Sequence, residues 1–319
     1  MKSMQAMALG AMLSLAALSA SAAYPERPIR MVVPFPAGSG TDTMVRIIAE
    51  PLSRSLGQNI VVENKPGADG SVAASDVARA APDGYTLLMA TNSPLSAVPA
   101  LRKKPPYDAV ADFTPITDVG RYRYFVLVHP SLPVRSIAEL IDYAKQHPGE
   151  LNFATGNTYG QVSTFQFMRS NGFEMMHIPY KGEPPALTDF VAGRVQFMFA
   201  TQSTSLSFVN TGKLRALATT SRERLEQLPD VPTLKDVGLP DMPTLPWAAL
   251  FGPAGMPDDV VKRLNKEMND ILAREDVKQQ LSRQAFETTG STPEQLAAMI
   301  EEQIGLWKTT LAELGIQPE

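Results

Sequence analysis

The 319-residue sequence contains no cysteine. Disulfide bonds, thiolate nucleophiles and cysteine-ligated metals are therefore excluded. The histidines are few and scattered, and their positions do not have the spacing of metal ligands. The sequence also lacks a G-x-S-x-G elbow, a G-x-x-x-x-G-K-[ST] loop and an H-E-x-x-H helix. These absences predict a protein without catalytic residues, metal or cofactor, and hence no enzyme.

A strong excess of charge of one sign is also absent. Lysine and arginine together number 29 and aspartate and glutamate 33, so the formal net charge is −4. A mildly acidic chain lacks the basic footprint that nucleic acid requires, and we expect no such partner. It also lacks a global field that would attract an anion, so the attraction of an anionic ligand must be local.

Long hydrophobic runs are missing except at the N-terminus. Lys2 precedes a predominantly apolar run over residues 6–20, and Ala20-Ser21-Ala22 gives a small-x-small cleavage pattern. This run is shorter than the about 20 residues that span a bilayer. The sequence therefore predicts a cleavable signal peptide over residues 1–23 and export of the rest, without a lipid anchor because no cysteine follows. The alternative is an uncleaved membrane anchor.

After residue 24, short apolar segments alternate with amphipathic ones, which favours an α/β fold with largely parallel sheets. Pro51 lies inside the first expected helix and predicts a kink or an early stop there. The expected strands are residues 30–33, 59–63, 85–90, 124–129, 151–154, 176–180, 195–200, 214–219 and 247–252. The expected helices include residues 42–56, 137–146, 162–170, 186–191, 257–283 and 293–314.

The length exceeds what one hydrophobic core usually fills, so two lobes are expected. We predict a first lobe from residues 24–122 and 247–319, and a second lobe from residues 123–246. The second lobe ends in a connector, residues 221–246, that is rich in proline, glycine and aspartate. Two crossings between lobes describe a hinged clamshell, in which ligands bind at the carboxyl ends of the strands.

The first candidate binding element is the turn over residues 36–42, which joins an apolar strand to a helix. Gly38 and Gly40 allow close backbone approach, Ser39 and Thr41 add hydroxyl donors, and Asp42 can cap the helix. Free N–H groups and the helix dipole favour an anion at such a place. The alternative interpretation is an ordinary strand–helix connection.

Two further turns follow strands of the second lobe. Residues 155–161 are dense in hydrogen-bond donors and precede a helix, although they could form an ordinary N-cap loop. Residues 178–182 place Tyr180 and Lys181 at another strand end, where Lys181 could face the cleft or the solvent. Donor-rich turns in both lobes predict one acid held between them.

Several pieces of the sequence, in their order and spacing, are similar to one known family. They are residues 24–30, 33–42, 62–68, 82–88, 178–182, 212–218 and 228–233. The chain resembles the extracytoplasmic solute receptors of tripartite tricarboxylate transporters, the Bug or TctC family. The resemblance spans the chain that follows the expected signal peptide.

The resemblance implies a two-lobed, type II-like periplasmic-binding-protein clamshell, with a mostly parallel sheet flanked by helices in each lobe. It also implies a monomer that captures a small carboxylate in the periplasm and delivers it to a membrane permease. In this family, a turn of each lobe grips the carboxylate. The expected ligand-binding residues are Phe35, Ala37, Gly38, Ser39, Gly40, Thr41, Asp42, Asn92, Thr155, Gly156, Asn157, Thr158, Gln161, Ser163, Tyr180 and Thr201.

One departure from the family bears on the ligand. The family commonly has an aspartate where this chain has Ala200, and losing that carboxylate removes an acceptor and a repulsive charge from the cleft. We therefore expect a di- or tricarboxylate or an aromatic acid rather than an amino acid. Two other functions stay open: a periplasmic sensor that presents its acid to a signalling kinase, and an exported hydrolase or isomerase.

Overall fold

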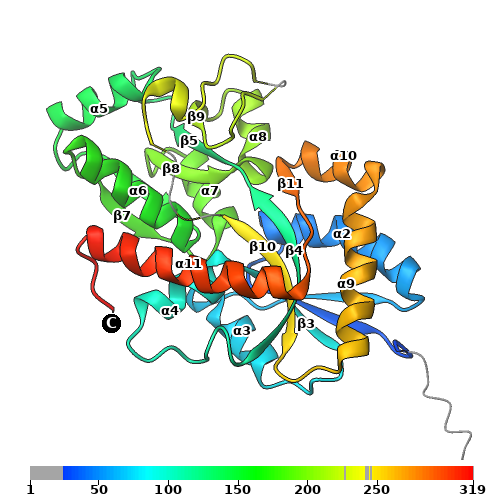
Figure 1. The fold of residues 1–319 in the computed structure, drawn as a ribbon. Coiled ribbons are helices and arrows are strands. Elements are labelled where there is room, and N and C mark those ends of the chain that lie inside the picture. The colour runs from blue at the N-terminus through cyan, green and yellow to red at the C-terminus, as the bar shows by residue number, and fades with distance from the viewer. Residues whose placement is uncertain (1–23, 226–227, 241–243, 245, 319) are drawn as a thin grey trace, which may run out of the picture.

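The computed structural model describes residues 24–225, 228–240, 244 and 246–318. The expected signal peptide, residues 1–23, lies outside the described residues, as do parts of the expected connector. The described chain forms two β-sheets, each flanked by helices, in two lobes that face each other (Figure 1). No helix in the described ranges is both long and apolar enough to cross a membrane.

The first lobe is built on a six-stranded sheet with the order β11-β4-β10-β3-β1-β2. Its strands are β1 (Ile29–Val33), β2 (Ile60–Asn64), β3 (Thr86–Thr91), β4 (Phe113–Tyr122), β10 (Trp247–Pro253) and β11 (Phe286–Thr288). Its helical segments are α2 (Gly40–Leu56), η1 (Ala68–Gly70), α3 (Ser71–Ala78), η2 (Ser93–Ala97), α4 (Val98–Leu101), α9 (Asp258–Ala273), α10 (Glu275–Arg283) and α11 (Pro293–Glu313).

The second lobe is built on a five-stranded sheet with the order β7-β6-β8-β5-β9. Its strands are β5 (Tyr124–Val128), β6 (Asn152–Thr155), β7 (Met176–Pro179), β8 (Phe197–Thr201) and β9 (Arg215–Thr219). Its helical segments are α5 (Ile137–Gln146), α6 (Thr158–Asn171), α7 (Glu183–Val191), α8 (Gln202–Asn210) and η3 (Lys235–Val237).

The chain passes between the lobes through strands that are antiparallel to their neighbours in the sheet. Arg123 alone separates β4 of the first sheet from β5 of the second, and β5 pairs antiparallel with β8 and β9. The returning strand, β10, pairs antiparallel with β3 and β4. Apart from β5, β10 and the short β11, the strands of each sheet point the same way. The two sheets therefore present their carboxyl edges to one another.

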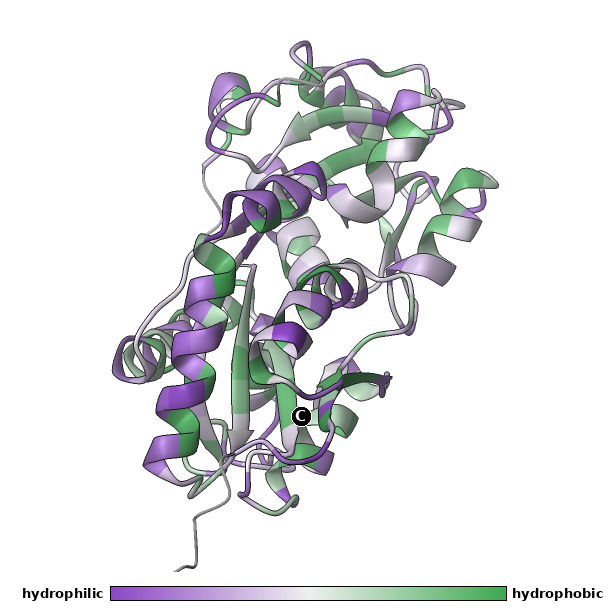
Figure 2. Cartoon of the chain, turned by 90° about the vertical axis from the view of Figure 1, so that its right-hand side faces the viewer, coloured by the Kyte–Doolittle hydropathy of each residue, from purple (hydrophilic) through white to green (hydrophobic). Residues whose placement is uncertain are grey.

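The inner strands are apolar and buried on both faces, as expected where helices cover a sheet on each side, whereas the edge strands β2 and β7 are partly exposed. Every residue of β5 and β10 is buried, and Figure 2 shows the hydrophobic strands inside a more hydrophilic shell of helices. Phe125, Phe199, Trp247 and Phe251 are among the largest fully buried side chains. Burial of these strands fixes the scaffold from which the turns project.

The structure differs from the sequence expectations in several elements. The expected helix over residues 257–283 is broken at Arg274, whose backbone is extended, into α9 and α10. Pro51 does not stop α2, which continues to Leu56 and ends at Gly57 in the left-handed conformation. The sequence did not predict β4, β11, α8 or the helical segment from Ser93 to Leu101. Strand β4 contains Pro115 and Gly120 and has register shifts against β10, which hide its strand pattern.

We expect the pairing of β4 with β11 to require glycine at position 120. Its φ is +155°, and an added Cβ would overlap the backbone carbonyl oxygen of Glu287. Gly120→Ala should therefore lower the free energy of unfolding by about 1–3 kcal/mol, measured by urea denaturation. The control is Gly305→Ala in α11, where the new Cβ meets nothing within 4 Å. This control should be neutral or stabilising by up to about 1 kcal/mol. Equal stability of the two variants would contradict the strain assigned to Gly120.

Candidate ligand-binding site

Four helices begin where the facing edges of the two sheets end. Helix α2 starts after Ser39 in the first lobe, and α6, α7 and α8 start after Asn157, Gly182 and Thr201 in the second. The first turn of a helix leaves its N–H groups without intrahelical partners, and the helix dipole adds partial positive charge there. The arrangement therefore concentrates main-chain donors between the lobes.

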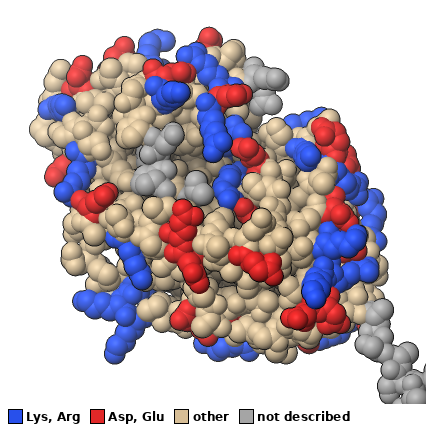
Figure 3. Space-filling model, viewed as in Figure 1, with Lys and Arg blue, Asp and Glu red and all other residues tan. Residues whose placement is uncertain are grey.

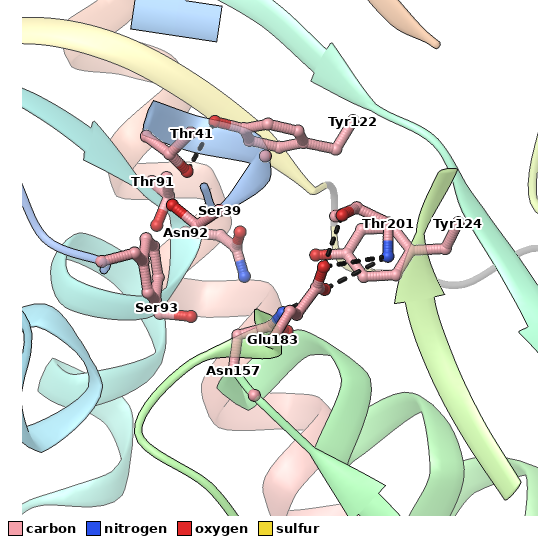
Figure 4. Close-up of a pocket in the computed structure, with 13 residues that line it drawn as sticks. Ser39, Thr41, Thr91, Asn92, Ser93, Tyr122, Tyr124, Asn157, Glu183 and Thr201 are labelled. Carbon is pink, nitrogen blue, oxygen red and sulfur yellow. Dashed lines mark hydrogen bonds between the residues drawn. The ribbon is translucent and has the colours of Figure 1, made fainter. Parts of the chain in front are cut away.

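A cavity of about 30 Å³ lies at this meeting point (Figure 4). One water needs about 10–15 Å³ of such space, so the lobes meet closely around it. From the first lobe it is lined by Phe35, Ser39, Gly40, Thr41, Thr91, Asn92, Ser93 and Tyr122, and from the second by Tyr124, Gly156, Asn157, Glu183 and Thr201. No lysine, arginine or histidine is among these residues.

The turn before α2 is held by its own side chains. The Ser39 hydroxyl accepts a hydrogen bond from the Asp42 N–H at 3.3 Å, and Asp42 accepts one from the Gly38 N–H at 2.9 Å. Arg46 and Asn64 also donate to the Asp42 carboxylate. Burial opposes ionisation of Asp42, but these hydrogen bonds outweigh it and lower its pKa. Asp42 therefore shapes the turn and does not line the cavity.

Some donors of the first lobe have no partner within the protein. Among the described residues, no hydrogen bond engages the main-chain N–H of Gly40 or Thr41. The Thr91 hydroxyl and the Asn92 Nδ2 are also buried without a hydrogen-bond partner, and both residues are only 3 % exposed. A buried polar group left unpaired costs about 1–3 kcal/mol. An acceptor placed in the cavity would remove that cost.

The second lobe contributes a buried carboxylate, Glu183, at the first position of α7. Its Oε1 accepts from Asn157 Nδ2 at 2.9 Å and from the Thr201 N–H at 3.1 Å. Its Oε2 accepts from the hydroxyls of Thr201 and Thr204 at 2.5 Å and 2.7 Å. Burial nevertheless raises the pKa of Glu183, with these hydrogen bonds acting in the opposite direction.

Glu183 changes the premise of the expectation that was drawn from Ala200, while the expectation about the ligand itself stays a prediction. The missing aspartate does not leave the cleft without a carboxylate, because Glu183 supplies one from the end of a different strand, β7. The preference for a plain di- or tricarboxylate or aromatic acid over an amino acid therefore loses its premise. The one signal in the sequence was the glutamate directly after the turn at residues 178–182, at the start of a helix opened by Pro184 and Pro185.

The structure brings half of the expected ligand-binding residues to the cavity wall. These are Phe35, Ser39, Gly40, Thr41, Asn92, Gly156, Asn157 and Thr201. The cavity lining does not include Ala37, Gly38, Asp42, Thr155, Thr158, Gln161, Ser163 or Tyr180. Sequence reasoning missed Thr91, Ser93, Tyr122, Tyr124 and Glu183, which also line it.

Contacts within the second lobe explain why several of the expected residues lie outside the cavity lining. The Thr155 hydroxyl is hydrogen-bonded to His177 Nε2 at 2.7 Å. The Tyr180 hydroxyl donates to Asp189 at 2.7 Å, and Lys181 is exposed. Ser163 is buried in α6, beyond its first turn. The second turn therefore reaches the cavity only through Gly156 and Asn157.

Two glycines let the lobes approach each other beside the cavity. A Cβ on Gly40 would lie 2.8 Å from Ser203 Oγ and 3.2 Å from Thr201 Oγ1 of the second lobe. A Cβ on Gly182 would lie 2.7 Å from Pro36 Cδ of the first lobe. A β-branched side chain at Gly40, or any side chain at Gly182, would press on the opposite lobe, so these glycines allow the lobes to approach closely.

On the face in view, charges of both signs are spread over most of the surface, and several basic side chains gather at its lower left edge (Figure 3). Among the described residues, no group of histidine, aspartate and glutamate could hold a metal ion. The site consequently depends on hydrogen-bond donors and on Glu183.

Residues 44–316 match the family described as the tripartite tricarboxylate transporter family receptor, TctC. The chain belongs to this family. This chain is 35 % identical to the protein BugT of Bordetella pertussis over 295 residues, which cover 92 % of this chain and 90 % of BugT. The resemblance stated from the sequence is thereby confirmed.

Solved structures of TctC-like proteins share the fold. A structure titled as Rpa4515 of R. palustris with adipate has a TM-score of 0.89 at 33 % identity and covers 93 % of this chain and 100 % of its own. The periplasmic binding protein BugD has a TM-score of 0.88 at 32 % identity, with coverage of 93 % and 100 %. MatC of Rhodopseudomonas palustris, with bound malate, has a TM-score of 0.84 at 31 % identity, with coverage of 90 % and 100 %. These neighbours confirm the predicted periplasmic-binding-protein fold.

The geometry around Asp42 predicts a pH-dependent contribution to stability. Asp42→Asn should lower the free energy of unfolding by about 1–3 kcal/mol at neutral pH, because charged hydrogen bonds are lost. The pKa of Asp42 is lowered on folding, so its contribution is present above the ordinary value of 3.8 and disappears as the pH falls through the lowered folded value. Urea denaturation at several pH values should show the wild type and variant converging in acid. The exposed Asp142→Asn control should show no such trend, and a pH-independent difference at Asp42 would contradict this assignment.

Proposed function

We propose that this chain is a periplasmic solute receptor that captures a small carboxylate by closing its lobes around the described cavity. The observation that carries the proposal is the set of donors without partners: the N–H groups of Gly40 and Thr41, the Thr91 hydroxyl and the Asn92 amide. A carboxylate accepts several hydrogen bonds at once and matches such a set. The structures similar to this chain include proteins with bound adipate and malate.

These donors are sufficient for micromolar affinity for a carboxylate without a cationic side chain. A hydrogen bond to a charged group contributes about 1.5–3 kcal/mol, so three or four of them give roughly 5–10 kcal/mol. Immobilising the ligand and closing the lobes cost several kcal/mol, and contacts with the rest of the ligand add to the gain. Micromolar binding, which corresponds to about −8 kcal/mol, is therefore attainable.

The proposal includes delivery of the bound acid to the membrane permease of a tripartite tricarboxylate transporter. Lobe closure would let the permease distinguish the loaded receptor from the free one. Export through cleavage of residues 1–23 and action as a monomer belong to the same proposal. No histidine, lysine or cysteine lines the cavity, and its one carboxylate, Glu183, already accepts hydrogen bonds from four donor groups, which supports binding over catalysis.

Substitution at Gly40 tests the closure of the lobes. Gly40→Val should reduce affinity at least tenfold without lowering the melting temperature of the ligand-free protein, because its side chain would meet Ser203 and Thr201. Isothermal titration with an acid chosen by a thermal-shift screen measures the effect. Gly40→Ala combined with Ser203→Ala should bind better than Gly40→Ala alone, because the closest obstruction is removed. Unchanged affinity in Gly40→Val would remove this turn from the site.

An uptake measurement tests the proposed delivery of the bound acid to the permease. In cells that carry the corresponding permease, deletion of this chain should abolish uptake of the acid that stabilises the purified protein. Complementation with the wild-type chain should restore uptake, whereas Gly40→Val should not. Normal uptake in the deletion strain, together with tight binding in vitro, would instead favour a sensor that reports the acid to a kinase.

A further inference from the structure

The cavity is chemically asymmetric. The first lobe offers donors that have no partners, and the second lobe offers a carboxylate, Glu183. Building on the proposed function, we propose that the ligand is a small acid that also carries an ammonium group. Its carboxylate binds the donors of the first lobe, and its ammonium group lies beside Glu183.

The first-lobe wall is suited to an anionic group and not to a cation. The N–H groups of Gly40 and Thr41 begin α2, where the helix dipole favours negative charge. The Thr91 hydroxyl and Asn92 Nδ2 supply an independent indication, because both are buried without a partner at the cavity wall. Figure 4 shows Asn92 and Glu183 on facing sides of the cavity. A bound carboxylate at the first-lobe wall would thus have Glu183 opposite it.

Glu183 is positioned by the second lobe as a fixed acceptor. Asn157 from the start of α6, and Thr201 and Thr204 from the start of α8, all donate to its carboxylate. These bonds hold the carboxylate in one place at the cavity wall. Every one of these donors is neutral, so none of them carries a full positive charge, although the first turn of α7 adds the partial charge of its helix dipole.

No residue that lines the cavity carries a positive charge to balance Glu183. A second carboxylate of a plain diacid would meet this negative charge in a site shielded from solvent, where like charges repel strongly. An ammonium group would instead balance the charge of the Glu183 carboxylate. The chain thus discriminates against diacids that reach Glu183 and favours their amino counterparts.

The other titratable groups that face Glu183 are the phenols of Tyr122 and Tyr124. Burial raises the pKa of both, so they stay neutral over the range in which a carboxylate titrates. The pKa of Glu183 is itself raised by burial. Ionised Glu183 is needed to bind an ammonium group, so affinity for an amino acid should fall as the pH is lowered. A plain diacid would show the opposite trend, because it needs Glu183 protonated.

The experiment compares acids that differ by one ammonium group, using isothermal titration of the mature protein at pH 8 and pH 5.5. The pairs are succinate with aspartate and butanoate with 4-aminobutanoate, and malate and adipate are added as plain diacids. For the wild type at pH 8, at least one ammonium-bearing acid should bind about tenfold or more tightly than its partner. Its affinity should fall at pH 5.5.

Two variants test whether the preference for an ammonium-bearing acid comes from the Glu183 side chain. Glu183→Gln keeps the size of the group but removes its charge, and it should lose at least tenfold in affinity for the ammonium-bearing acid and gain affinity for the plain diacid. Glu174→Gln changes an exposed glutamate outside the cavity and should behave as the wild type. If Glu183→Gln does not fold, the wild-type comparison of matched pairs and its pH trend decide the question.

The outcomes separate this inference from the proposed function. If plain diacids bind as tightly as their amino counterparts or better, with affinity rising toward pH 5.5, the inference is wrong while the carboxylate receptor stands. If no acid binds the wild type at either pH, the proposed function fails and the inference fails with it.

Discussion

The structure depends on one constraint: the first turn of a helix has main-chain donors that the helix itself cannot satisfy. Parallel strands that lead into helices put these first turns at one edge of each sheet. The antiparallel crossing strands β5 and β10 then set the two edges face to face. The unpaired donors of the first lobe lie at the cavity between the lobes, and the negatively charged ligand that we propose follows from that geometry and not from the overall charge of the protein.

This constraint gives the residues of the site different roles. Asp42 and Asn157 hold their turns through the N–H groups of Gly38 and Gly160, which leaves the N–H groups of Gly40 and Thr41 free. Gly40 and Gly182 have no side chain because the opposite lobe lies where a Cβ would be. Glu183 is the exception in this donor-rich wall, and the groups that donate to its carboxylate are all neutral.

The sequence predicted the parts of the site that are local. The first turn was recognisable because small residues follow an apolar strand and precede a helix, and Ser39, Gly40 and Thr41 do reach the cavity. The approach of Tyr122, Thr91 and Glu183 was not predictable, because it depends on strand order and on how the lobes face each other. Tyr180 and Thr155 have the chemistry of ligand-binding residues, but contacts with Asp189 and His177 engage them within the second lobe.

The measurement that tests the central claim most directly is a crystal structure of the protein with the acid that binds it. We expect the ligand carboxylate within hydrogen-bond distance of the Gly40 and Thr41 N–H groups and of Asn92 Nδ2, with the lobes closed over it. A ligand bound elsewhere, or bound between the lobes with those donors still unpaired, would contradict the account.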